Sequence, residues 1–101
     1  MNTLAAIQLR AKDASMAVIA EVTGEAFHKR DGWAVTEAWE RFVTTAFKAY
    51  AAGVISDVQY HEVARIAAAD PTTLADAVAN LQMAARTLRD DISEWERDRA
   101  L

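Results

Sequence analysis

Residues 70–95 read DPTTLADAVANLQMAARTLRDDISEW, and this stretch decides the fold. Its apolar residues recur in alternating steps of four and three, which is the spacing of one buried face of a long α-helix. These residues are Leu74, Val78, Leu81, Ala85, Leu88, Ile92 and Trp95. Asp70 followed by Pro71 is typical of a helix start, with the acid as N-cap and the proline at the first helical position. We therefore predict a helix from Pro71 to about Arg99.

Glycines divide the part of the chain that precedes this helix. The whole sequence has only three glycines and one proline, so each carries boundary information. Gly32 and Gly53 predict helix ends, because glycine is favoured where a helix stops. We expect one helix from Thr3 to Arg30, with Gly24 as an internal weak point, and a second from Trp33 to Ala52.

A short helix is expected between Gly53 and Asp70. Ser56 and Gln59 have the spacing of a capping box, in which each side chain satisfies a backbone donor near the other residue. This spacing predicts a helix over about Asp57–Ala69. The chain thus reads as an all-α, single-domain four-helix bundle spanning residues 1–101, with long first and last helices and a short third helix.

The composition argues against several classes of function. A chain of 101 residues with 52% hydrophobic and 26% charged residues is typical of one globular domain. It has no cysteine, which excludes disulfides, thiolate metal sites and cysteine nucleophiles. The formal net charge of -4 disfavours nucleic acid as a partner. No uncharged run approaches the roughly twenty residues that span a bilayer, and charges from Arg10 onward interrupt any leader peptide, so we expect a cytoplasmic protein without a membrane partner.

The sequence contains only incomplete versions of known metal-binding and catalytic motifs. Glu25 and His28 have the spacing of one half of a di-iron site, but no second pair accompanies them. His61 and Glu62 begin a zinc-protease pattern whose fifth position is Arg65, which cannot bind a cation. We therefore expect no catalytic, metal or cofactor site, and we do not expect an enzyme.

Acidic residues gather at the end of the last predicted helix. The candidate binding residues here are Asp90, Asp91, Glu94 and Asp98, with Trp95 as an apolar anchor between them. Negative charge at a helix C-terminus opposes the helix dipole, so local stability does not explain this pattern. Either these acids are a solvated polar face, or they form a docking surface for a partner with a basic surface.

The first predicted helix carries two apolar stripes. Leu4, Ile7, Ala11, Ala14, Val18 and Val22 form one stripe, and Leu9, Met16, Ala20 and Phe27 form a second on roughly the opposite side. Packing within one small bundle buries only one of these two stripes. The second is either core or an interface, with another protein or with a second copy in a homodimer. We take Leu9, Met16 and Phe27 as its candidate partner-binding residues.

Residues 62–74, EVARIAAADPTTL, contain one further pattern. Ala64 stands at a small helix-contact position, Asp70 at a polar cap and Leu74 at a buried aliphatic position. In these features the segment resembles the helix-turn-helix of lactose-repressor-type regulators, which implies DNA binding. Ala68 stands where that family has a turn glycine, and no lysine or arginine follows until Arg86 to neutralise phosphate.

Together these observations favour a non-catalytic protein that binds another protein and occludes its surface. Small acidic helical proteins of this kind are often inhibitors or adaptors, including inhibitors carried by phages and mobile elements, an analogy from size and class alone. The alternatives are a helix-turn-helix DNA-binding regulator and a self-assembling structural subunit.

Overall fold

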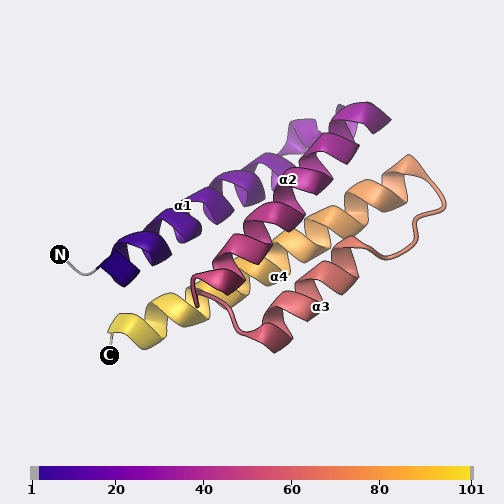
Figure 1. Cartoon of the computed structure of the whole chain (residues 1–101). Coiled ribbons are helices and arrows are strands. Elements are labelled where there is room, and N and C mark those ends of the chain that lie inside the picture. Colours follow the sequence, from indigo (N-terminus) through magenta and orange to yellow (C-terminus); the bar gives the residue numbers. More distant parts are fainter. Residues whose placement is uncertain (1–2, 101) are drawn as a thin grey trace.

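The computed structural model describes residues 3–100, which form four α-helices and one short 3₁₀ helix, with no strand among them (Figure 1). The elements are α1 (Thr3–Thr23), η1 (Glu25–Lys29), α2 (Gly32–Ala51), α3 (Asp57–Ala67) and α4 (Leu74–Ala100). The predicted all-α four-helix bundle is confirmed. None of the helices within the described range has the length and apolarity needed to cross a membrane.

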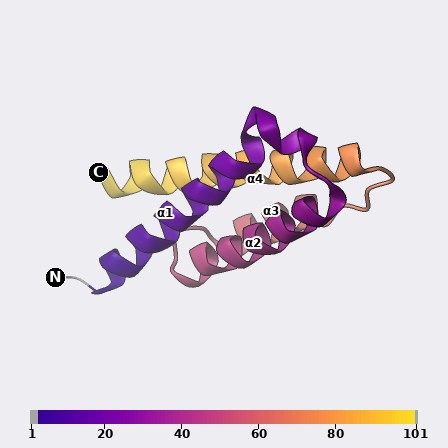
Figure 2. The same ribbon diagram turned by 90° about the horizontal axis from the view of Figure 1, so that it is seen from above.

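Successive helices run in opposite directions along a bundle of 45 × 23 × 19 Å (Figures 1 and 2). α1 packs on α2 and α4, and α3 packs on the same two helices from the other side. α2 and α4 also approach each other across the diagonal. Both helices carry fully buried alanines, among them Ala38, Ala49, Ala84 and Ala85.

The predicted face of α4 is confirmed along its middle. Val78, Leu81, Ala85, Leu88 and Ile92 are all buried in the core. The two ends of the series differ, since Leu74 is exposed and Trp95 is only half-buried. The periodic pattern therefore marks core wherever neighbouring helices flank α4, and it loses this meaning at the ends of the bundle.

The end of α2 and the start of α3 match the sequence prediction to within a residue. Gly53 follows the C-cap of α2 with φ +80°, a backbone conformation that favours glycine. At α3, the Ser56 hydroxyl accepts a hydrogen bond from the Gln59 backbone N–H at 3.1 Å, and the Ser56 N–H donates to Gln59 Oε1 at 2.8 Å. This is the predicted capping box.

The first helix is shorter than predicted. α1 ends at Thr23, and Gly24 is extended with φ −68° and ψ 150° before the separate turn η1. A continued helix would hold Phe27 on the outer stripe, whereas the break redirects the chain and buries Phe27 at 1% exposure. Burial of this aromatic ring outweighs the few backbone hydrogen bonds that a longer helix would add. α1 thus has 21 residues, one more than α2, and ends at Thr23 rather than at the predicted Arg30.

The last helix begins later than predicted. Asp70 and Pro71 lie before α4, whose N-cap is Thr73 rather than Asp70. The Thr73 hydroxyl accepts a hydrogen bond from the Asp76 N–H at 3.1 Å, and the Thr73 carbonyl accepts from the Ala77 N–H at 3.0 Å. Both threonine and aspartate are good N-caps, so residue type alone did not separate the two positions.

α3 and α4 form an antiparallel hairpin joined by residues 68–73 (Figure 1). A helix-turn-helix instead crosses its two helices at about 90–120° through a turn of about three or four residues. The arrangement that the resemblance to lactose-repressor-type regulators implies is therefore not the one this segment adopts. The pair is part of the bundle wall, with Val63 and Ala67 of α3 buried in the core.

Candidate functional site

The three candidate residues of the second stripe occupy three different environments. Leu9 is 43% exposed on α1, while Met16 is half-buried and packs against the core. For Phe27 the core alternative holds and the candidate partner-binding role does not, because η1 carries its ring into the core. Phe27 is therefore structural, and only Leu9 offers substantial apolar surface on this side of α1.

The acidic candidates of α4 divide into two groups. Asp90 and Asp98 are exposed, and Asp90 lies 3.7 Å from Arg89. Asp91 and Glu94 instead lie beside α3, where the Gln59 side-chain amide donates to each carboxylate at 3.4 Å. α3 thus brings an uncharged donor to two of the predicted residues.

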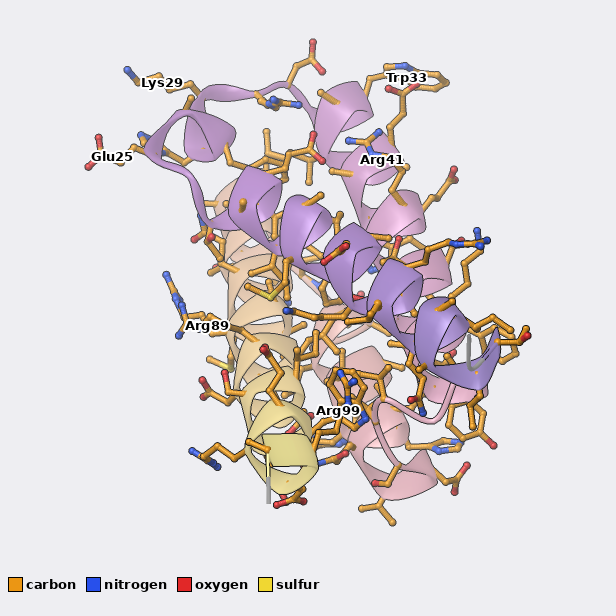
Figure 3. All side chains as sticks on the ribbon, turned by 90° about the vertical axis from the view of Figure 1, so that its left-hand side faces the viewer. Glu25, Lys29, Trp33, Arg41, Arg89 and Arg99 are labelled. Atoms are coloured by element: carbon orange, nitrogen blue, oxygen red, sulfur yellow. The ribbon has the colours of Figure 1, made fainter. Side chains whose placement is uncertain are left out.

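Trp95 is covered by a cation. The Arg99 guanidinium lies 4.5 Å from the centre of the half-buried Trp95 ring, near the end of α4 (Figure 3). A cation over an indole face is attractive and shields that face from solvent. Trp95 is therefore a weaker anchor for a partner than its sequence position suggested.

Asp91 lies at the centre of what we call the carboxylate cluster, formed by Glu62 of α3 and Asp90, Asp91 and Glu94 of α4. Burial raises the pKa of the Asp91 carboxyl to about 6, with further contributions from the negative charges of Glu62, Glu94 and Asp90. The Asp91 Oδ2 atom is buried and has no hydrogen-bond partner. Within residues 3–100, no lysine or arginine pairs with Glu62, Asp91 or Glu94, so the cluster holds uncompensated negative charge.

Aromatic side chains gather on the opposite flank of α3. The rings of Tyr50 from α2 and Tyr60 from α3 are stacked with their centres 5.3 Å apart. Phe47 meets both edge-on, at 6.0 Å from Tyr50 and 5.8 Å from Tyr60, and is itself 51% exposed. We call this surface the aromatic face and define it as Trp39, Val43, Phe47 and Tyr50 of α2 with Tyr60 of α3.

The far end of the aromatic face contains a cavity. Trp39 is anchored there, because its indole N–H donates to the Ala67 carbonyl of α3 at 2.8 Å. Beside it lies a mostly apolar cavity of about 280 Å³, whose lining includes Val35, Trp39, Pro71 and Leu81. The contact between α2 and α3 thus has clustered aromatic rings at one end and a hollow at the other.

None of the residues of the aromatic face was singled out from the sequence as a binding candidate. A signal was present in α2, where Trp39, Val43, Phe47 and Tyr50 recur at steps of four, four and three. This series forms a flank beside the buried residues of the helix.

Other site types find no support in the geometry of the described chain. Across residues 3–100, no three histidine, aspartate or glutamate side chains are grouped so as to hold a metal ion. The His61 side chain contacts its own helix, with its Nδ1 atom 2.8 Å from the Asp57 carbonyl oxygen in the preceding turn. Comparisons with protein-family models, with curated proteins and with solved structures found no match for this chain.

Proposed function

We propose that this chain is a non-catalytic binding protein that docks a partner protein on the aromatic face, with the carboxylate cluster favouring a partner that carries basic residues. The observation that carries the proposal is the exposed Phe47 ring, held edge-on by the stacked rings of Tyr50 and Tyr60. Tyrosine and other aromatic residues are enriched at the centres of protein interfaces and dominate their binding energy.

The arrangement lowers the entropic cost of binding. Tyr50 and Tyr60 are already half-buried and packed against the core, so a partner that covers them immobilises few additional torsions. Phe47 loses its exposed apolar area when it is covered, which is favourable in proportion to that area. Rigid aromatic groups with exposed edges are therefore suited to an affinity-determining role.

The two flanks of α3 favour one kind of partner. Gln59 contacts the carboxylate cluster and the next residue, Tyr60, belongs to the aromatic face, so both surfaces adjoin the same helix. A lysine or arginine of the partner near Asp91 would supply the charge that the cluster lacks. The combination favours a partner segment with an apolar residue beside basic ones.

A small bundle that covers such a segment blocks it from other molecules, and we therefore favour an inhibitor or adaptor acting by occlusion. The acidic net charge of -4 supports steering of a basic partner. We assign this role to the cytoplasm, since a chain without cysteines needs no oxidising compartment for folding.

The test is capture of partners from host lysate, in the presence of nuclease, by the wild-type chain, by Phe47→Ser and by Leu9→Ser. A captured protein is then purified and its affinity for each variant measured by calorimetry. We expect Phe47→Ser to weaken binding at least tenfold, because an interface aromatic contributes about 2 kcal/mol or more when truncated. Leu9→Ser, a matched exposed apolar substitution on α1, should bind as the wild type does.

Two results would overturn the proposal. Loss of binding in Leu9→Ser but not in Phe47→Ser would show that the partner binds α1 instead of the aromatic face. Capture of nucleic acid alone, lost on nuclease treatment, would favour a DNA-binding role instead. Far-UV circular dichroism of each variant distinguishes a folded variant that no longer binds from a variant that is unfolded.

A further inference from the structure

A groove runs between α1 and α2, on the side of α2 away from α3. Its broad, shallow part has a volume of about 770 Å³ and its middle is lined by short side chains, including Ala14, Ala17 and Thr44. A more apolar hollow of about 440 Å³ adjoins it, and Ala14 and Lys48 border both. Short side chains let another helix approach closely, and Ile7, 45% exposed at the edge of the hollow, provides apolar area to cover.

The two ends of this groove carry opposite charge. Glu37 and Glu40 lie at the end near the start of α2, and Arg10 and Lys48 lie toward the other end. No ion pair within the described chain engages any of these four residues.

A third acid at the first end, Glu21, is contacted by two arginines, which also bring positive charge to this end. Glu21 accepts from Arg30 at 3.1 Å and from Arg41 at 2.7 Å, and Arg41 reaches it from α2 toward α1 (Figure 3). The unpaired acids Glu37 and Glu40 are thus separated along the groove from the unpaired bases.

We propose that the α1–α2 groove is the interface of a homodimer, in which the α2 helices of two copies cross antiparallel at Thr44. Glu40, Thr44 and Lys48 are exposed and follow one another at steps of four, so they share one face of α2. A two-fold axis at Thr44 places Glu40 of each copy opposite Lys48 of the other. The interface then contains the same ion pair twice, as an isologous contact requires.

Only this orientation uses the charge separation. If the two grooves met with their like ends together, Glu40 would face Glu40 and Lys48 would face Lys48, which is repulsive. The proposed interface borders the aromatic face, since Phe47 follows Thr44 by three residues on the same helix, whereas Trp39 and Tyr60 lie at the α3 flank. The dimer goes beyond the proposed partner-binding function and is tested by self-association alone.

Sedimentation velocity over a range of concentrations tests the dimer with charge-reversal variants. Glu40→Lys alone and Lys48→Glu alone each turn two ion pairs into two like-charge contacts. Each should weaken self-association at least about tenfold. An equimolar mixture of the two single variants should restore the dimer, because every Lys then faces a Glu of the other chain. The double variant Glu40→Lys/Lys48→Glu should restore it for the same reason.

Arg65→Glu, at an exposed position of α3, is the matched control, and this variant should show the same sedimenting mass as the wild type. A wild-type chain that stays monomeric up to millimolar concentration overturns the proposal. A dimer that both single variants retain overturns it as well, since self-association then uses another surface. Circular dichroism confirms that each variant is folded, and the mixing experiment separates a disrupted interface from a disrupted fold.

Discussion

At pH 7 the Asp91 side chain is held mostly ionised between α3 and α4, against its own burial and against three neighbouring carboxylates. Its folded-state pKa of about 6 lies above the roughly 3.9 expected of an unfolded chain. Between these two values the folded state binds a proton that the unfolded state does not. The stability that protonated Asp91 contributes is therefore complete below about pH 4 and is lost as the pH rises through 6.

We predict from this shift that Asp91→Asn is more stable than the wild type at pH 7 and equally stable near pH 4. The gain at pH 7 should be about 1 kcal/mol once solvent screening of this half-buried group is included. Urea unfolding at both pH values measures it, through a change of midpoint at constant slope. Asp98→Asn, at an exposed site on the same helix, is the matched control for the loss of one negative charge. A variant less stable than the wild type at pH 7 would contradict the assigned cause.

At the scale of single elements, the start of α4 offers a direct comparison between two caps. Thr73→Ala removes the hydroxyl that accepts from the Asp76 N–H and should lower the free energy of unfolding by about 1 kcal/mol. Asp70→Ala should change it by less than about 0.5 kcal/mol, because Asp70 is exposed and precedes the helix. Thermal and urea unfolding of the two variants check this order. A larger loss of unfolding free energy in Asp70→Ala than in Thr73→Ala would show that Asp70 is the N-cap, as predicted from the sequence.

Helix ends were predictable where the chain carries a signal that only one conformation satisfies. Gly53 with positive φ and the reciprocal bonds of Ser56 and Gln59 are such signals, and both boundaries were predicted to within a residue. Gly24 is different, since its φ of −68° is open to any residue. Its break is set by the burial of Phe27, a tertiary contact that a helical wheel of the first segment does not contain.

At the scale of the whole molecule, the candidate site was only partly predictable for the same reason. The acids Asp91 and Glu94 were identified from their spacing on one helix. The aromatic face requires Phe47 and Tyr50 of α2 to meet Tyr60 of α3, and this contact depends on which helices are neighbours. Pairing of helices follows from the packing of the complete bundle, so a pattern within one element does not reveal it.

α4 contacts all three other helices of the bundle, so one face of it is enclosed in the core. Ala85 of α4 is fully buried, whereas Ala79 on the same helix is exposed. We predict that Ala85→Leu lowers the free energy of unfolding by about 1–3 kcal/mol, because the added side chain must displace well-packed neighbours. Ala79→Leu should change it by no more than about 0.5 kcal/mol. Alanine and leucine have similar helix propensities, so the difference between the two variants isolates packing. Urea unfolding midpoints measure it, and equal effects at both positions would show that the core around Ala85 is loose rather than close-packed.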